Sequence, residues 1–335
     1  MTVVRVLFAF LPVCLFLGSL LYIDSYKLVS LKNLLRVIVY GGVAALASYV
    51  LNRQVLRGTF VDHNTLTRLV APAIEELLKL LPVAILLYTR RIGFVIDAAI
   101  CGFAAGAGFA LIENLYYMTM LPDRSVAFWI VRGFGTAVMH GGTTAIAAMI
   151  TKVFFQRRER ESVALIVPGF IVAFAIHSVF NQFILSPLAS ALAVTIVLPP
   201  LLVLVFEQSE RYLQGWIGSG FDLDAELLKA IRSGDFVSSR PGRYLQSLRE
   251  HFDGPAVADM LCYLQLIAEL SLRAKGVLML RENGLPVARD EESRQKLTEL
   301  AYLKASIGKT GQLALAPILG RSSHDLWQLR LLEEL

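Results

Sequence analysis

Residues 94–119 read FVIDAAICGFAAGAGFALIENLYYMT, and this stretch decides the class of fold. It is almost entirely apolar and long enough for a helix to cross the hydrocarbon core of a bilayer, which takes about 20 residues. Its charged residues are Asp97 and Glu113. A charge inside a span costs about 2.5–3.5 kcal/mol on insertion scales, so a span that keeps one needs a reason for it. The stretch therefore predicts a transmembrane helix, with Glu113 as a candidate functional residue.

The composition of the whole chain agrees with a membrane protein. Of its 335 residues, 56% are hydrophobic and 18% are charged, whereas an ordinary soluble domain has about 25% charged residues. Such a chain is too apolar to be intrinsically disordered. Cys14, Cys101 and Cys262 are widely spaced, which excludes a disulfide scaffold and a zinc site built from thiolates.

Working outward from the quoted stretch, we find six more apolar segments of sufficient length. The seven predicted spans are residues 4–23, 34–51, 71–88, 94–119, 126–150, 163–185 and 189–206. The first has no small-residue cleavage site after it, and we expect it to be retained rather than removed as a signal peptide. The predicted fold class is all-α, a polytopic membrane bundle of about seven transmembrane helices.

The net charge changes sign along the chain. It is +7 for residues 1–206 and −2 for residues 207–335. The positive charge lies in short loops between apolar segments, which indicates membrane topology and argues against nucleic-acid binding. With the N-terminus outside, the inner loops carry nine Lys and Arg residues and the outer loops carry four. This excess predicts a C-terminal part in the cytosol.

Residues 207–335 have the pattern of a soluble helical domain. Gly and Pro breaks separate segments with apolar periodicity, and the segment is long enough to form a core of its own. Residues 257–280 are long and apolar, but polar and charged side chains interrupt them, so we predict a soluble helix there. We divide the chain into a transmembrane domain, residues 1–206, and a cytosolic helical domain, residues 207–335, for which we expect a cytosolic partner.

Polar side chains recur inside four of the predicted spans. They are Glu75, Glu76 and Lys79 in the third span, Glu113 and Asn114 in the fourth, His140 in the fifth, and His177 and Asn181 in the sixth. Residues spaced i,i+4, such as His177 and Asn181, share a helix face. The two adjacent glutamates point about 100° apart, so one can face a cavity while the other pairs with Lys79.

These residues are expected to lie at one depth. Successive spans run in opposite directions, and a helix rises 1.5 Å per residue. On this scale residues 75–76 lie about 7 Å from the outer end of their helix, Glu113 about 10 Å and His177 about 12 Å. His140 lies about 20 Å deep, or about 12 Å if Arg132 sits at the interface before the helix proper. The sequence therefore predicts one polar pocket in the outer half of the membrane.

Each residue taken alone also has a structural explanation. Pro72 followed by two acids is an ordinary helix start, Lys79 can neutralise those acids, and a lone histidine often bonds a neighbouring helix. The common depth favours a joint site over separate coincidences. A buried acid and imidazole site also suits a proton-coupled transporter, and a non-catalytic membrane scaffold is a third interpretation.

In this order and on successive helices, the motifs resemble those of PrsW-type intramembrane proteases, distant relatives of the CAAX-processing membrane endopeptidases. The resemblance covers roughly residues 70–185 and rests on Glu75-Glu76-x-x-Lys79, Phe109-x-x-x-Glu113-Asn114, His140 and His177-x-x-x-Asn181. Members of the broader group often have His where this chain has Glu113. The resemblance implies an endopeptidase that makes a site-1 cut in a membrane-anchored protein, typically an anti-sigma factor. That cut is expected near the extracytoplasmic face of a bacterial cytoplasmic membrane.

Peptide hydrolysis needs an activated water, a donor to the developing oxyanion and a proton for the leaving amine. We assign one of residues 75–76 as general base on the water and the other as its electrostatic partner. His140, together with His177 oriented by Asn181, would polarise the substrate carbonyl. Glu113 would orient a histidine or the water.

The same residues also allow a metal route. Glu113, His140 and His177 are candidate ligands for zinc, which lowers the pKa of its bound water to about 7. The sequence has no His-Glu-x-x-His pair of the kind that marks many zinc proteases. We therefore favour glutamate catalysis without a cofactor, with zinc as the alternative.

Overall fold

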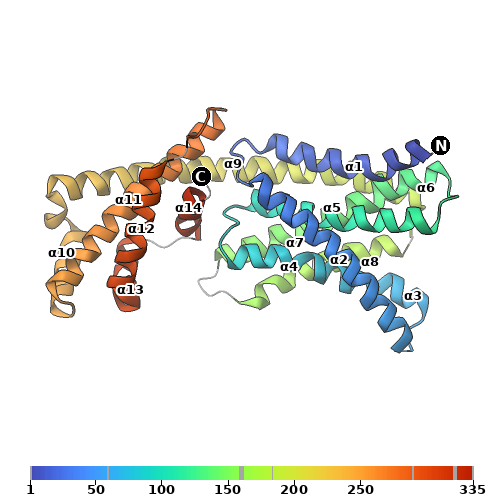
Figure 1. Cartoon of the computed structure of the whole chain (residues 1–335), viewed down its shortest axis with the longest axis horizontal. Helices are drawn as coiled ribbons and strands as arrows, with labels where there is room; N and C mark the ends of the chain where they lie inside the picture. Colours follow the sequence, from blue (N-terminus) through green and yellow to red (C-terminus); the bar gives the residue numbers. More distant parts are fainter. Residues whose placement is uncertain are drawn as a thin grey trace. The chain divides into compact units, whose positions relative to one another are not determined.

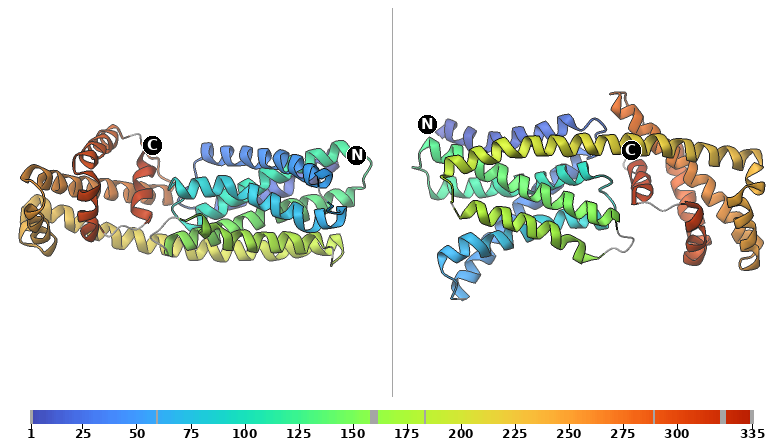
Figure 2. Two further views of the ribbon diagram at one scale, coloured as in Figure 1. Left: turned by 90° about the horizontal axis from the view of Figure 1, so that it is seen from below. Right: turned by 180° about the vertical axis from the view of Figure 1, so that it is seen from behind.

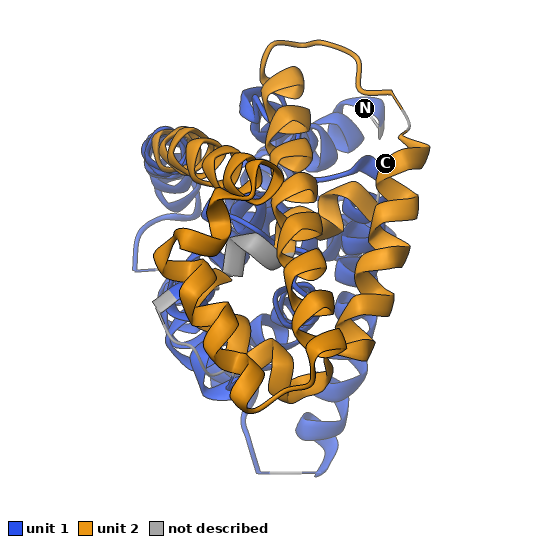
Figure 3. Ribbon diagram, turned by 90° about the vertical axis from the view of Figure 1, so that its left-hand side faces the viewer, with its two compact units in different colours: residues 1–209 blue, residues 210–335 orange. Residues whose placement is uncertain are grey.

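The computed structural model describes residues 2–58, 60–157, 162–182, 184–288, 290–319 and 323–333. Throughout these ranges the regular structure is helical, and they contain no strand. The all-α prediction is confirmed. The chain forms two compact units, Met1–Ser209 and Glu210–Leu335, which Figure 3 colours separately. Arg158 and Arg160, two of the basic residues assigned to the inner loops, lie outside the described residues.

Unit 1 is a bundle of long apolar helices (Figure 1). In chain order its elements are α1 (Thr2–Ile23), α2 (Leu31–Gly58), α3 (His63–Thr65), η1 (Leu66–Val70), α4 (Ala71–Tyr88), α5 (Val95–Met120), α6 (Val126–Ile130), η2 (Val131–Ala137), α7 (Val138–Arg157), η3 (Val163–Ile166), α8 (Val167–Asn181) and α9 (Pro187–Ser233), which continues into unit 2. Both η1 and η2 are π-helical. Each of these two segments leads directly into a helix that carries predicted site residues, α4 or α7.

By length and composition, seven helices suffice to cross a membrane. They are Val3–Ile23, Leu31–Gly58, Val95–Met120, Val126–Gln156, Val163–Asn181, Pro187–Ser233 and Gly254–Glu282. Six overlap predicted spans, although Pro187–Ser233 continues well beyond residue 206, and the prediction of a polytopic membrane bundle is confirmed. The seventh, Gly254–Glu282, lies in unit 2, where we predicted a soluble helix. The predicted span at residues 71–88, which is α4, is not among the seven. Three charged residues make α4 too polar by composition, yet it is 18 residues long and packs against α2, α5, α7 and α8, so we keep it as a span.

Helix α5 is the most enclosed of the seven candidate spans, and 83% of its most apolar stretch is buried. It packs against α1, α2, α4 and α7 (Figure 1). Glycines allow the approach of α7. A Cβ atom at Gly106 would lie 2.1 Å from the carbonyl oxygen of His140, and one at Gly102 would lie 2.6 Å from that of Thr144. The small residues of the quoted stretch therefore bring the backbones of α5 and α7 together. On its other side α7 packs against α8, drawn in light green in Figure 2.

Unit 2 is built around α11. Its elements after α9 are η4 (Asp235–Ser238), α10 (Arg240–Ser247), η5 (Leu248–Glu250), α11 (Gly254–Glu282), α12 (Glu291–Ser306), α13 (Gly308–Leu319) and α14 (Ser323–Glu333). Lys275 of α11 is buried, and its ammonium group donates to Asp224 of α9 at 2.5 Å and to Ser271 of α11 at 2.8 Å. The buried charge of Lys275 is thereby paired inside unit 2.

Replacing Gly106 by alanine tests the close contact of α5 with α7. The added Cβ would lie 2.1 Å from a backbone oxygen, so the two helices must separate. Overpacking of this kind costs about 1–3 kcal/mol, and we expect a lower thermal unfolding midpoint for the purified protein in detergent. Gly18→Ala in α1 is the matched control, because nothing lies within 4 Å of its added Cβ. Equal midpoints for the two variants would contradict the described packing.

Candidate active site

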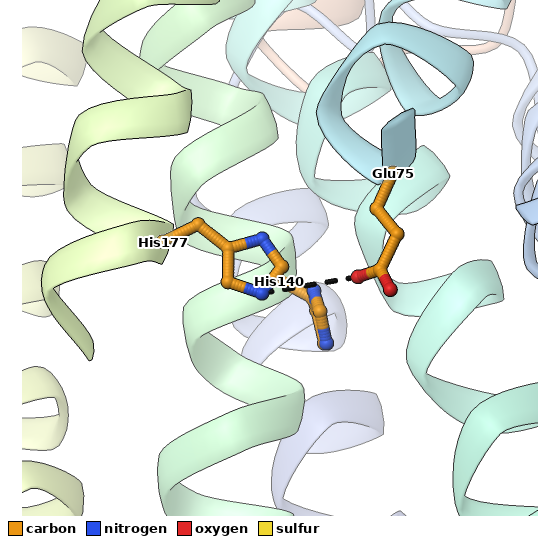
Figure 4. A group of neighbouring side chains, drawn as sticks. All are labelled: Glu75, His140 and His177. Atoms are coloured by element: carbon orange, nitrogen blue, oxygen red, sulfur yellow. Dashed lines mark ion pairs between the residues drawn. The ribbon is translucent and has the colours of Figure 1, made fainter. Parts of the chain in front are cut away.

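Four helices bring the predicted polar side chains together inside unit 1. The contributors are Glu75, Glu76 and Lys79 from α4, Phe109, Glu113 and Asn114 from α5, His140 from α7, and His177 and Asn181 from α8. The exposed fraction is 0% for Glu76 and Lys79, 1% for His140 and 2% for His177. Figure 4 shows Glu75, His140 and His177 turned towards one another from three different helices. The site therefore lies in the interior of the bundle.

Glu76 is the hub of the cluster. Its Oε1 accepts hydrogen bonds from Lys79 Nζ at 2.5 Å and from Thr143 Oγ1 at 3.2 Å, and it lies 2.8 Å from His177 Nδ1. The lysine holds Glu76 as a carboxylate, which can only accept, so the ring proton of a neutral His177 sits on Nδ1. The other ring nitrogen of His177, Nε2, then carries a lone pair.

The proton of His140 can be placed by the same reasoning. Lys79 Nζ lies 3.0 Å from His140 Nδ1, and an ammonium group can only donate. In the neutral ring the proton is therefore on Nε2, which donates to Glu113 Oε2 at 3.1 Å. The ring of Phe109 packs on this imidazole with centroids 5.0 Å apart, and Lys79 Nζ lies 5.0 Å from the centroid of Phe109. Lys79 thus connects Glu76 to His140.

Sequence reasoning missed Arg132 as a site residue and considered it only as an interface residue in one of the two depths derived for His140. In the structure it is 9% exposed, and its Nη2 donates to Glu113 Oε2 at 2.8 Å. Its Nε donates to Asn114 Oδ1 at 2.9 Å, while the amide nitrogen of Asn114 donates to the carbonyl oxygen of Ala9 at 2.7 Å. The available signal was a charged residue within a predicted apolar span, which needs a partner in the bundle.

Glu75 has a different environment from the other two acids. Its Oε1 accepts from Asn52 Nδ2 at 3.5 Å, and its Oε2 lies 3.8 Å from His177 Nε2 (Figure 4). Since Nε2 of the neutral ring is an acceptor, two acceptors face each other across a gap too long for a direct hydrogen bond. A water that donates to each atom, or a cation that binds both, would satisfy this pair.

The predicted contact between Asn181 and His177 does not form among the described hydrogen bonds. Asn181 Nδ2 instead donates to the carbonyl oxygen of Thr67 in η1 at 3.0 Å. Both nitrogens of His177 face acids, so Glu76 rather than Asn181 orients the ring. Asn181 therefore ties α8 to the π-helical segment that precedes α4.

The family model described as PrsW family intramembrane metalloprotease matches residues 29–206, more than half of the chain and every helix that contributes the predicted site residues. The chain belongs to this family. No curated protein and no solved structure matches the chain. As a PrsW family member the chain is an integral membrane protein and a peptide hydrolase, and the predicted class of enzyme is confirmed.

The description of the PrsW family as metalloproteases raises the question of whether these residues fit a metal ion. Glu75, His140 and His177 offer ligand atoms that all lie within 4.8 Å of one another. Two imidazoles and a carboxylate are a common donor set of catalytic zinc, and the contact of Glu76 with the far nitrogen of His177 is the kind that orients a zinc-binding histidine. The set fits zinc, with Glu75 in the place that the sequence assigned to Glu113.

Removing the ammonium group of Lys79 tests the ion pair at the hub. Lys79→Met leaves Glu76 buried without its cation, and breaking such a pair typically costs about 3–5 kcal/mol. We expect a loss of that size in the free energy of unfolding, and partial recovery in the double variant with Glu76→Gln. Arg36→Met is the control, because Arg36 is an exposed cation on α2. If Lys79→Met is no less stable than Arg36→Met, the pair is not buried as described.

Proposed function

We propose that the chain hydrolyses a peptide bond of a membrane-anchored protein, with Glu75 as the general base on water. The difference between the three acids supports this choice. Lys79 neutralises Glu76, and Arg132 neutralises Glu113. No lysine or arginine contact is described for Glu75, whose partners are Asn52 and His177. A carboxylate without a paired cation is the better proton acceptor of the set.

In the proposed reaction a water lies between Glu75 Oε2 and His177 Nε2 and donates a hydrogen bond to each. Both bonds direct a lone pair of the water oxygen towards the substrate carbonyl. Glu75 takes a proton as the oxygen bonds to the carbonyl carbon. The carboxylic acid so formed returns the proton to the amine nitrogen as the carbon–nitrogen bond breaks.

The carbonyl oxygen needs a hydrogen-bond donor as its negative charge develops. We assign this role to His140, whose Nε2–H donates to Glu113 in the structure and would be shared with the carbonyl oxygen when a substrate binds. The ring nitrogen on the other side accepts from Lys79, so the ammonium charge is transmitted towards the imidazole. His177 completes the site by holding the water opposite Glu75.

If zinc is present, Glu75, His140 and His177 are the residues that would hold it. Zinc supplies an acidified water and an electrophile for the carbonyl. In the structure both nitrogens of His140 are engaged, one by Lys79 and one by Glu113, so metal binding requires that one of these contacts be given up. This cost supports the glutamate route.

Chelation separates the two routes. We expect purified active protein to keep its activity after exhaustive treatment with a zinc chelator, and metal analysis to find zinc well below one ion per chain. Stoichiometric zinc that is lost together with activity, and restored together with it, would overturn the glutamate route.

We propose an anti-sigma-factor-like substrate, cut at site 1 near the extracytoplasmic side of a bacterial cytoplasmic membrane. The excess of Lys and Arg in alternate loops supports an outside N-terminus and a cytosolic C-terminal domain. In that orientation the acids of α4 and α5 lie in the outer half of the bilayer. Residues 207–335 then face the cytosol, where we propose that they bind a partner protein.

Cleavage of a single-span substrate reconstituted with the enzyme in lipid vesicles tests the assignment. General bases contribute about 10²–10⁴-fold, so we expect Glu75→Gln to lower kcat by that factor. The variant should unfold like the wild type, because Glu75 has no ion pair with lysine or arginine to lose among the described contacts. His63→Gln, an exposed histidine outside the predicted spans, is the control and should leave cleavage unchanged.

Full cleavage by Glu75→Gln would remove Glu75 from the mechanism. A wild-type protein that cleaves no single-span substrate, while proton-driven uptake is lost in Glu75→Gln, would instead favour a transporter.

A further inference from the structure

We propose that Arg132 is a positioning residue of the active site, which acts through Glu113 to hold the imidazole of His140. The proposal rests on the proposed proteolytic function, since it assigns a part of that same site. The described hydrogen bonds of Arg132 run to Glu113 and Asn114 and to neither Glu75 nor His177, between which the attacking water is proposed to lie. Its effect on the reaction is therefore indirect.

The contacts of Arg132 are those of a clamp. Two of its nitrogens donate to neighbouring side chains of α5, Glu113 at 2.8 Å and Asn114 at 2.9 Å, and its guanidinium carbon lies 4.2 Å from the centroid of Tyr117. A planar guanidinium with several fixed donors suits such a set, whereas an ammonium group binds as a point charge. Arg132 thereby links three side chains of α5 through one guanidinium group.

The clamp reaches the site through one oxygen atom. Glu113 Oε2 accepts from Arg132 Nη2 at 2.8 Å and lies 3.1 Å from His140 Nε2. Because Arg132 keeps Glu113 charged and fixed, the carboxylate has to accept the ring proton of His140 on Nε2. The opposite nitrogen then has to accept from Lys79. Arg132, acting through Glu113, and Lys79 therefore together set the orientation and the tautomer of the ring.

The π-helical segment explains how Arg132 comes to face the same way as His140. The two residues are eight apart, which in a regular α-helix leaves them about 80° from each other, at about 100° per residue. In η2 (Val131–Ala137) the wider i→i+5 turns advance through fewer degrees per residue and close this angle. Both side chains consequently meet the same oxygen of Glu113. Segments of this kind are frequent at functional sites.

Steady-state cleavage of the reconstituted substrate tests the role. For Arg132→Ala we expect kcat to fall about 10- to 100-fold, as for other residues that orient a catalytic ligand, with KM within about twofold of the wild type. Arg132→Lys, which cannot hold Glu113 and Asn114 together, should be intermediate. Arg124→Gln is the control, because Arg124 is exposed and its guanidinium lies over the ring of Phe128.

Chemical rescue separates positioning from general stabilisation. Added guanidinium ion should raise kcat of Arg132→Ala several-fold, and should leave the Glu113→Gln variant unchanged, since guanidinium acts on the carboxylate.

If Arg132→Ala has the kcat of the wild type, the proposal is overturned while the inactivity of Glu75→Gln keeps the proposed function. If Arg132→Ala unfolds more readily and guanidinium restores nothing, the role is structural and the proposal is likewise overturned. A wild-type protein that cleaves nothing would remove the proposed function and this inference with it.

Discussion

A carboxylate and an ammonium group, those of Glu76 and Lys79, lie 2.5 Å apart in the interior of the bundle, and both side chains are fully buried. Taking two such charges out of water costs several kcal/mol for each, and their attraction offsets that cost only if further polar partners surround them. The partners are Thr143 and His140 from α7 and His177 from α8. The need to satisfy one ion pair therefore fixes three helices and places both imidazoles.

The apolar part of the sequence makes this arrangement possible. Small residues at Gly102 and Gly106 let α7 approach α5 so closely that a methyl group would collide with its backbone. Glu113, on the same helix as these glycines, then reaches His140 at 3.1 Å. A helix pair at an ordinary distance would leave a gap between the carboxylate and the ring. Packing and chemistry are thus linked through the same stretch of α5.

Much of this could be predicted from the sequence, because apolar length, loop charge and helix rise are local properties. They predict the all-helical membrane fold, and they place acids and imidazoles from four spans at one depth. The 100° between adjacent side chains also predicts that one glutamate can pair with Lys79 while its neighbour faces a cavity. Composition alone excludes α4 from the candidate spans, although the charges of Glu76 and Lys79 pair with each other inside the bundle.

The rest depends on features that spacing rules do not contain. The i,i+4 rule assumes a regular helix, and the π-helical turn of η2 moves Arg132 onto a face where that rule does not place it. Asn181 shares a face with His177 but bonds a carbonyl of another element, which depends on tertiary packing.

A side-chain-resolution structure of the protein in lipid nanodiscs tests the central claim most directly. It should show Glu76 bonded to both Lys79 and His177, with Glu75 facing His177 across the bundle interior. Acids turned towards lipid, or imidazoles on opposite sides of the bundle, would contradict it.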